Sequence, residues 1–494
     1  NQGTDDDGTS YRSYASSEGI AGAGGGELGI AGSLSLVFSY DSSEASLGQN
    51  VGISAPGDID VTATSTNKIV NRAWAVAVAS DVTCDNPGNC GSSSGDKTAV
   101  GASIAVNIVI DNNSAIIGEG ATLTAGDNVT VAAKDLSSGA GDFTLDPQDE
   151  NTTSEDYITT NYTVMLQDSS YYAEAIAGGA AQGGNAGSGS LAVTVSVGKT
   201  EAIVGEAVSI FADDVEISAY NESEARHLVG AVALSTDKKA IGASISGIYL
   251  REDVRTIVGD DGSTDDGDNT TITASTGDVD ISAKADQDTL TFMAAGGVSG
   301  NDLALAGAFG FNVMDTDVEA RIVEDALIQA SAGSIDVSAD SFTNIRNLAL
   351  SIAGSGGSNS AGGSLALNMF LTDKKAIIGD STTTDNNIVL NAANAVNIGV
   401  DAKQEILNGV ISASVSTSSN ALSGALSANI VKGETYALAN RGTSINDNTT
   451  LNSASSTQSV DVIANDNTTI TDLTGTLAAS SSTSVGVALG ANVF

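Results

Sequence analysis

The feature that most constrains the fold of this chain is a degenerate repeat that runs its whole length. The most regular part is a phrase of apolar, polar, apolar, any and small residue, as in Ile59-Asp60-Val61-Thr62-Ala63. The phrase begins at residues 59, 129, 215, 279, 335, 396 (in weaker form) and 460, so the differences between successive starts run from 56 to 86 residues. Self-similarity of this kind indicates a stacked array, in which each unit buries its apolar surface against its neighbours. Such arrays mostly serve as long surfaces and spacers, which makes an enzyme the less favoured class.

A second phrase, rich in glycine and alanine, ends in asparagine, as in Gly101-Ala102-Ser103-Ile104-Ala105-Val106-Asn107. Equivalent segments end at Asn312, Asn368, Asn429 and Asn492. In a solenoid, equivalent positions of successive coils stack about 4.8 Å apart, so the asparagines would form an inward ladder with hydrogen-bonded amides. The alternative is that asparagine merely ends the strand, and the sequence leaves both open.

These phrases divide the chain into one continuous array with approximate units 1–98, 99–187, 188–239, 240–303, 304–360, 361–420 and 421–484, and a truncated unit 485–494. The last copy of the second phrase stops near Phe494 and the first residue is Asn1, so we interpret the chain as an excerpt of a longer array. An insertion at 142–172, which carries four tyrosines, lengthens one unit and is expected to protrude from one side.

Within a unit, short apolar runs alternate with turn-forming residues, and no helix pattern is evident. In the unit at 341–400 we expect strands at Asn347–Ala353, Ser364–Leu371 and Ile388–Leu390, with a turn at Thr372–Lys375. The predicted fold class is therefore all-β, a repetitive β-solenoid or β-helix-like array of about seven units with four to six short strands each. One unit forms either a single broad coil or about three coils of roughly 20 residues.

The chain is strongly acidic. It has 61 acidic and 19 basic residues, and its net charge is −42. Such a surface repels phosphate backbones and anionic headgroups, so nucleic acid is excluded as a partner class. No apolar run approaches the roughly 18 residues of a membrane span, so no membrane insertion by this segment is expected.

Cys84 and Cys90 bracket the turn-forming residues 85–89 and are the only cysteines. Two cysteines that close a short loop between strands favour a disulfide, which implies an oxidising exterior. A metal site would need two further ligands, and no histidine or cysteine lies near in the sequence.

An acidic stretch between residues 260 and 269 collects hard oxygen ligands in a polar loop. Its candidate calcium ligands are Asp260, Asp261, Asp265, Asp266 and Asp268. The stretch lacks the EF-hand order, so a solvated acidic loop is the alternative, and no cofactor is required. Unchanged melting temperature and protease resistance after chelation would contradict calcium binding.

No catalytic constellation is evident. His227 is the only histidine, and we expect it at a strand edge, since a triad or a zinc site would need further partners that the sequence lacks. We therefore predict no catalytic and no cofactor-binding residues.

The phrases at 101–107, 115–118 and 127–134 resemble the repeats of very large secreted bacterial proteins. These are the filamentous-haemagglutinin-like and leukotoxin-like adhesins and the β-strand-repeat passengers of autotransporters. The resemblance covers essentially the whole chain. It implies an extracellular β-solenoid on a bacterial cell surface that acts in adhesion, biofilm or filament formation, and it carries over no catalytic residues.

The favoured hypothesis is thus a structural and adhesive shaft or filament. Its partners would be copies of itself, stacked end to end or laterally, or a host or substratum surface. One alternative is a polysaccharide-acting β-helix enzyme, which would need paired carboxylates in a cleft lined with aromatics, whereas aromatics are only 4% of the chain. Another is an ice- or mineral-binding surface, for which Thr122-Leu123-Thr124 and Thr271-Ile272-Thr273 carry the pattern but are expected out of register.

Overall fold

The fold is seen in a computed structural model of the chain. It describes residues 3–4, 10–11, 13–80, 83–86, 89–91, 97–136, 169–259, 269–379, 387–446 and 458–494. The described residues contain strands, turns and bends but no helix. The predicted all-β solenoid is confirmed.

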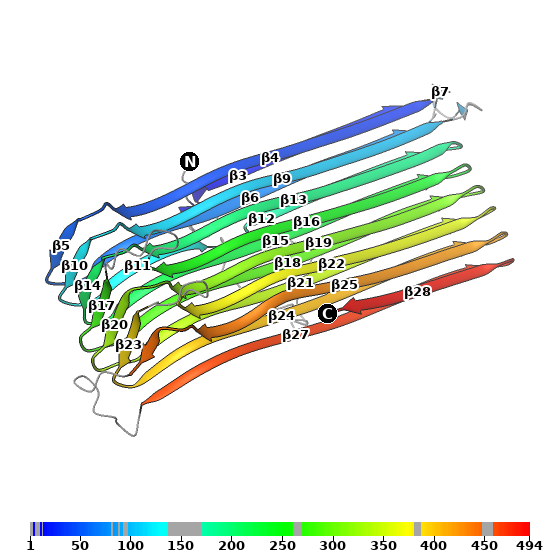
Figure 1. Cartoon of the computed structure of the whole chain (residues 1–494). Coiled ribbons are helices and arrows are strands. Elements are labelled where there is room, and N and C mark those ends of the chain that lie inside the picture. Colours follow the sequence, from blue (N-terminus) through cyan, green and yellow to red (C-terminus); the bar gives the residue numbers. More distant parts are fainter. Residues whose placement is uncertain are drawn as a thin grey trace, which may run out of the picture.

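Three parallel sheets build the molecule (Figure 1). The eight-stranded sheet contains β4 (Leu28–Leu47), β9 (Thr98–Ile117), β13 (Asn185–Val204), β16 (Ala240–Val258), β19 (Ala304–Ile322), β22 (Ser360–Ile378), β25 (Ala421–Ala439) and β28 (Ser484–Val493). The nine-stranded sheet contains β3 (Ser13–Gly25), β6 (Ile59–Ala79), β11 (Val129–Leu136), β12 (Tyr171–Ala181), β15 (Val215–Ser235), β18 (Val279–Ser299), β21 (Ile335–Ser355), β24 (Ala395–Ser416) and β27 (Ser459–Ser480). The seven-stranded sheet contains β5 (Gly52–Ala55), β10 (Thr122–Ala125), β14 (Ser209–Ala212), β17 (Thr270–Ala274), β20 (Ala326–Ala330), β23 (Ile388–Ala392) and β26 (Thr443–Ile445).

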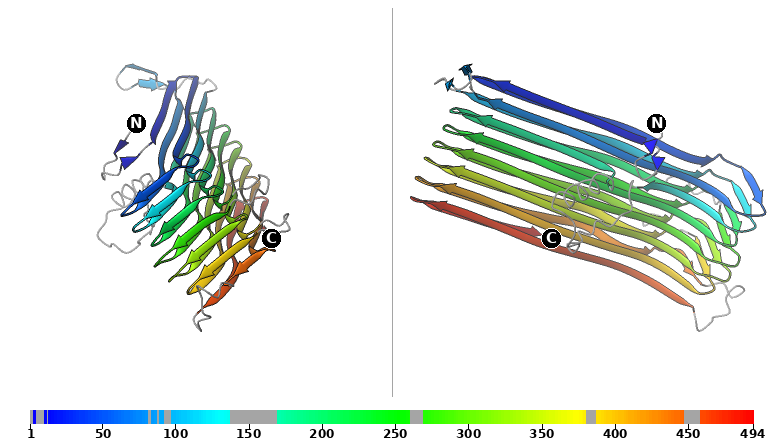
Figure 2. Two further views of the ribbon diagram at one scale, coloured as in Figure 1. Left: turned by 60° about the vertical axis from the view of Figure 1, so that its left-hand side comes forward. Right: turned by 180° about the vertical axis from the view of Figure 1, so that it is seen from behind.

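Each repeat forms one broad coil. The chain runs along a strand of the eight-stranded sheet, turns through a short strand of the seven-stranded sheet, and returns along the nine-stranded sheet. A tight turn then leads into the next coil, as from β16 through β17 and β18 to β19. The two long sheets lie face to face, and the short strands close one end of the slab (Figures 1 and 2). Of the two coil sizes left open by the sequence, the single broad coil is the one observed.

The prediction of four to six short strands for each unit was wrong. Most coils have three strands, and most of the long strands are 19 to 22 residues long. The polar segment expected to turn at Thr372–Lys375 continues β22, and Lys374 is fully buried in the slab. Ladder partners above and below satisfy the backbone of such a segment, so its polar side chains do not end the strand.

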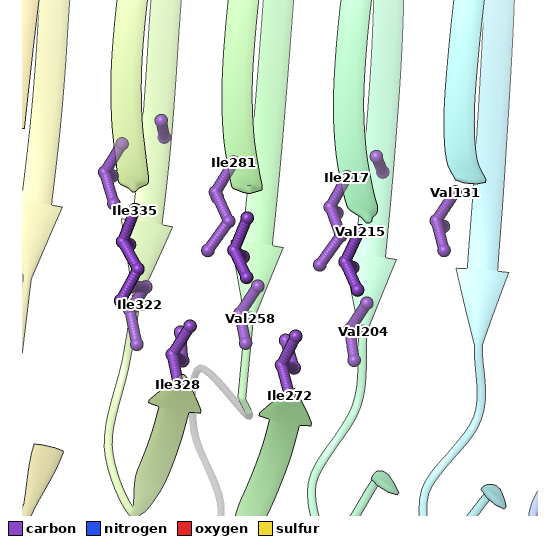
Figure 3. Close-up of a cluster of buried hydrophobic side chains, with 14 of the residues drawn as sticks. Val131, Val204, Val215, Ile217, Val258, Ile272, Ile281, Ile322, Ile328 and Ile335 are labelled. Carbon is purple, nitrogen blue, oxygen red and sulfur yellow. The ribbon is translucent and has the colours of Figure 1, made fainter. Parts of the chain in front are cut away.

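The interior is layered along the strands. Beside the seven-stranded sheet, valine, isoleucine and alanine from all three sheets form the largest core cluster, which includes Ile217, Val258, Ile272 and Ile328 (Figure 3). Farther along come further clusters, and toward the tight turns the core consists largely of alanine. In-register stacking brings the same residue type together on successive coils, as in the pairs Val215–Val279 and Val279–Ile335.

Glycine lets the two long sheets approach closely near the tight turns. A Cβ atom added at Gly242 would lie 2.1 Å from the carbonyl oxygen of Gly296 in the facing sheet. At Gly101 it would lie 2.2 Å from the carbonyl oxygen of Gly178. Real Cβ atoms do not approach backbone this closely, so a side chain at either position would push the sheets apart.

The corner between the eight- and seven-stranded sheets uses left-handed backbone. A residue one or two positions before a short strand has positive φ in several coils, as at Asn50 (57°), Gly120 (69°) and Gly442 (83°). Glycine and asparagine tolerate this region better than other residues, so the corner favours the turn residues found there.

The described strands β11 and β12 form one interrupted strand of the nine-stranded sheet, since both pair with β6 and β15. Most of the predicted protruding insertion at 142–172 lies outside the described residues. Its last two tyrosines, Tyr171 and Tyr172, begin β12 and are buried, so they do not protrude.

Candidate interaction surface

The outer surface of the eight-stranded sheet is apolar over much of its length. We call it the apolar face and define it by the outward positions of Ile30, Gly32, Leu34, Leu36 and Phe38 on β4 and their ladder partners through β28. At the Leu34 position the partners are Ile104, Leu191, Ile245, Phe309, Leu365, Leu426 and Leu489. In all five ladders every residue is apolar or glycine except Tyr249, whose ring carries a hydroxyl group.

Large side chains of this face are open to solvent. Leu34 is 59% exposed, Phe309 42% and Leu489 58%. Eight strands at about 4.8 Å and five alternate positions along strands that rise about 3.3 Å per residue give a face of roughly 900 Å². Soluble monomers rarely expose a contiguous apolar patch beyond a few hundred Å², so a face of this extent indicates a contact surface.

The apolar face has ridges and a groove. At the Gly32 position the ladder continues with Ala102, Gly189, Ala243, Gly307, Gly363 and Gly424, with Val487 on the last strand. Space is open above Gly32, Gly189, Gly363 and Gly424, since an added Cβ atom there would meet nothing within 4 Å. The Leu34 ladder flanks this line of small residues with bulky side chains. The face therefore presents a shallow groove along the coil axis beside a ridge of leucine, isoleucine and phenylalanine, and the ring of Phe309 interrupts the groove over Gly307.

Toward the seven-stranded sheet the same outer surface becomes charged. Lys199 pairs with Glu201 at 2.7 Å on β13, and Arg255 pairs with Asp253 at 2.5 Å on β16. On these two strands the signs alternate at successive outward positions, whereas β19 carries Asp315, Asp317 and Glu319 at the equivalent positions. The apolar face thus has a border that carries both signs, with acidic residues in excess on β19.

The outer surface of the nine-stranded sheet is apolar over a shorter stretch. Val76, Val232 and Ile352 are exposed in one ladder, where small residues stand on the strands between them. Charged residues follow a few positions away, as at Arg72, whose Nε lies 3.7 Å from Glu174 Oε2. The larger contact surface is that of the eight-stranded sheet.

Inside the slab, the recurring asparagines form a hydrogen-bonded ladder. Asn368 accepts from Asn312 Nδ2 at 3.2 Å and donates to Asn429 Oδ1 at 2.9 Å, and Asn429 donates to Asn492 at 2.7 Å. Asparagines of the facing sheet join it: Asn347 donates to Asn368 at 3.2 Å, and Asn368 donates to Asn408 at 2.6 Å. The inward-ladder interpretation is confirmed, and the strands continue beyond these residues rather than ending there.

The prediction that His227 lies at a strand edge was wrong. His227 is fully buried in the middle of β15, at a ladder position that asparagine occupies two coils away on either side, as Asn71 and Asn347. Its Nε2 lies 2.7 Å from Thr194 Oγ1 and its Nδ1 lies 2.7 Å from Ser246 Oγ. Burial lowers the pKa of His227 to about 3, so the ring is neutral at physiological pH and takes the place of an amide.

A second interior polar group consists of carboxyls from three different strands: Asp111 on β9, Asp135 on β11 and Glu252 on β16. Asn221 Nδ2 donates to Asp135 Oδ2 at 3.2 Å and to Glu252 Oε2 at 3.1 Å. Gly198 makes room for this group, since a Cβ atom there would lie 1.8 Å from Glu252 Oε2.

Burial governs the charge of these carboxyls. It raises the pKa of Asp111 to about 6, with a further contribution from the charge of Asp41, and it raises that of Glu252 to about 8. Burial, with the neighbouring Asp111 and Glu252, also raises the pKa of Asp135 well above its usual value. The cluster therefore retains protons near neutral pH, and among the described residues no group of three His, Cys, Asp or Glu side chains is arranged to hold a metal ion.

The predicted calcium ligands Asp260, Asp261, Asp265, Asp266 and Asp268 lie outside the described residues, so calcium binding there stays a prediction. Cys84 and Cys90 lie opposite each other in the antiparallel pair of β7 (Thr83–Asn86) and β8 (Asn89–Gly91). Their disulfide likewise stays a prediction.

The threonine motifs expected out of register are in register. Thr122 and Thr271 both pair with Ser209 of β14, from opposite sides. The ladder then continues from Thr271 to Leu327 and Val389, so the threonine pattern is not sustained over the seven-stranded sheet. Because both motifs stack on β14, they are in register although the chain segments that join β10 to β14 and β14 to β17 differ in length.

The apolar face was missed from the sequence, although a signal for it was present. In the phrase at 101–107, alternate residues of the strand point to the same side of the sheet, so Asn107 shares its side with Gly101, Ser103 and Ala105. If asparagine points inward, these small residues do too, and Ile104 must point outward.

Comparison with known proteins found no matching family model, curated protein or solved structure. No helix in the described part of the chain is long and apolar enough to span a bilayer.

Proposed function

We propose that the chain is a rigid section of a large extracellular bacterial surface protein, which serves as the shaft of an adhesin or the body of a filament. The observation that carries the proposal is the in-register parallel stacking of long strands from coil to coil. Between β18 and β21, for example, every residue from Val279 to Ser299 is paired. The repeat phrases that resemble those of secreted bacterial adhesins support the location.

Stiffness along the coil axis would follow from this stacking. To bend or stretch the slab along this axis, many backbone hydrogen bonds of three sheets would have to distort together. The asparagine ladder adds side-chain hydrogen bonds in the same direction. It also favours one register, because a slip by one residue would turn the buried amides outward and large apolar side chains into the tightly packed interior.

Self-association and adhesion are the expected uses of such a shaft. Copies would stack end to end or laterally, or the shaft would hold a binding region away from the cell toward a host or substratum surface. The net charge of −42 would keep extended arrays soluble and apart from anionic headgroups.

Surface labelling of the producing cells tests this proposal. Immunogold labelling with antibodies to the purified chain should decorate filaments or fibrous projections on intact cells. Treatment of intact cells with protease should remove the label. Label that appears only after permeabilisation, at the same level in protease-treated and untreated cells, would contradict the extracellular location.

A further inference from the structure

We infer that the apolar face of the eight-stranded sheet packs against the same face of a second copy of this chain. This inference does not rest on the proposed function, since a face of this kind needs a cover whether or not the chain is a surface shaft. It names the surface through which lateral association would occur.

The extent of the face suits a stable pair. At roughly 900 Å², estimated from strand spacing and rise, it matches the surface of about 800 Å² that each partner contributes to a standard specific interface. The covered area would be almost wholly apolar, which is characteristic of the cores of homodimer interfaces. Burial of exposed side chains such as Leu34, Phe309 and Leu489 would supply the driving force.

The shape of the face is suited to pairing with itself. Two sheets pack face to face at about 10 Å when bulky side chains of one fill spaces in the other. The open spaces above Gly189, Gly363 and Gly424 offer that room, and the adjoining ridge at Leu191, Leu365 and Leu426 offers the filling. A twofold axis in the plane of the interface, parallel to the coil axis and between the ridge and the groove, would place the ridge of each copy against the groove of the other.

The border of the face favours a protein over a lipid surface. Protein segments that lie in a membrane interface carry a surplus of lysine and arginine beside the apolar surface. Here Lys199 stands beside Glu201, and Arg255 stands beside Asp253, at 2.7 and 2.5 Å. The overall charge of −42 would also oppose approach to anionic lipid. Two copies can instead meet through uncharged faces while their borders remain in water.

The first test is the mass of the full chain in solution, measured by sedimentation equilibrium over a range of concentrations. The wild type should approach twice its chain mass of 49.1 kDa. A double variant with Phe309→Glu and Phe311→Glu should weaken association by roughly 100-fold or more, because each copy would bury unpaired charges. The matched control is Val232→Glu with Ile352→Glu, at comparably exposed apolar positions of the nine-stranded sheet, and it should associate like the wild type.

Several results would overturn the inference. These are a wild type that stays monomeric at all concentrations, a Phe309/Phe311 variant that associates normally, and loss of association in both variants alike. Circular dichroism should show that each variant keeps its strand content. If the phenylalanine variant does not fold, Ile245→Lys, at a 38% exposed position of the same ladder, replaces it.

A footprint distinguishes this face from any other contact. Met369 lies on the apolar face, at the Phe38 position, whereas Met293 is fully buried inside the slab. Oxidation of Met369 by hydroxyl radicals should be suppressed in the dimer and restored in the Phe309/Phe311 variant, while Met293 stays protected in both. Equal oxidation of Met369 in dimer and monomer would contradict the proposed interface.

The same variants separate a lipid partner from a second copy. Vesicles of neutral and of anionic phospholipid are incubated with the protein and pelleted, and no binding is expected. Binding by a monomeric wild type that the phenylalanine substitutions abolish would assign the face to lipid and overturn the inference. If the purified protein forms rods that do not pair laterally, the inference is refuted, whereas the proposed function as a shaft is unaffected.

Discussion

Asn368→Ala should destabilise the slab more than an ordinary polar substitution. Asn368 is 2% exposed and lies where asparagines of both long sheets meet. It makes four side-chain hydrogen bonds, with Asn312 and Asn347 as donors to it and with Asn408 and Asn429 as acceptors from it. Alanine removes all four.

The magnitude follows from the groups that are left behind. The amides of Asn312 and Asn347 lose their bond to Asn368 Oδ1, and Asn408 Oδ1 loses a donor, whereas Asn429 Oδ1 still accepts from Asn408 at 2.6 Å. A buried polar group left without a partner costs about 1 to 3 kcal/mol, and three such groups are left here. We therefore expect a loss of about 4 kcal/mol in the free energy of unfolding, a large share of the 5 to 15 kcal/mol typical of folded proteins.

The assay is guanidinium denaturation followed by circular dichroism, together with hydrogen exchange read by mass spectrometry. The second readout is needed because repeat arrays can unfold in parts. Faster exchange should be concentrated in β19, β22 and β25, which stack around the substitution. The control is Asn420→Ala, since Asn420 is exposed and donates to Asn359 at 3.1 Å, and it should cost no more than about 0.5 kcal/mol. Equal effects of the two substitutions would refute the role given to the buried ladder.

Two further predictions concern close sheet approach and buried acid groups. Gly242→Ala should destabilise the protein by about 1 to 3 kcal/mol or more, because the new Cβ atom would clash with a carbonyl of the facing sheet. The control is Gly189→Ala, whose Cβ atom would point into open space, and its melting temperature should stay close to that of the wild type. Similar melting temperatures of the two variants would contradict the close approach. Burial raises the pKa of Glu252 from its usual 4.5 to about 8, so between these pH values the folded state holds a proton that the unfolded state releases. The contribution of this proton to the free energy of unfolding is complete below pH 4.5 and is lost as the pH rises through 8. Glu252→Gln should therefore flatten the fall in stability between pH 5 and 8 by up to about 1.4 kcal/mol for each pH unit, and identical pH profiles of denaturation midpoints would contradict the buried proton.

The sequence was sufficient to predict the stacked array because repeats must stack. The phrases that begin at residues 215, 279 and 335 are paired residue for residue in the nine-stranded sheet. Strand length was not predictable in the same way. Thr372–Lys375 has turn-like composition, and only its ladder partners on β19 and β25 keep it extended.

The interior carboxyls were beyond sequence reasoning for a different reason. Asp111, Asp135 and Glu252 are far apart in the chain and stand among many other acidic residues. They meet because the register brings Asp111 and Glu252 to equivalent positions on either side of Gly198, while the nine-stranded sheet places Asp135 opposite. The apolar face, by contrast, was within reach of the sequence, because assigning Asn107 to the interior places Ile104 on the outer surface.

Cryo-electron microscopy of the purified chain tests the central claim most directly. The account predicts a stiff slab with strands about 4.8 Å apart along the coil axis. Two long sheets should face each other, with a short sheet at one end. A flexible string of separate compact bodies, or coils built from several small turns, would contradict the single rigid solenoid on which the proposed shaft depends.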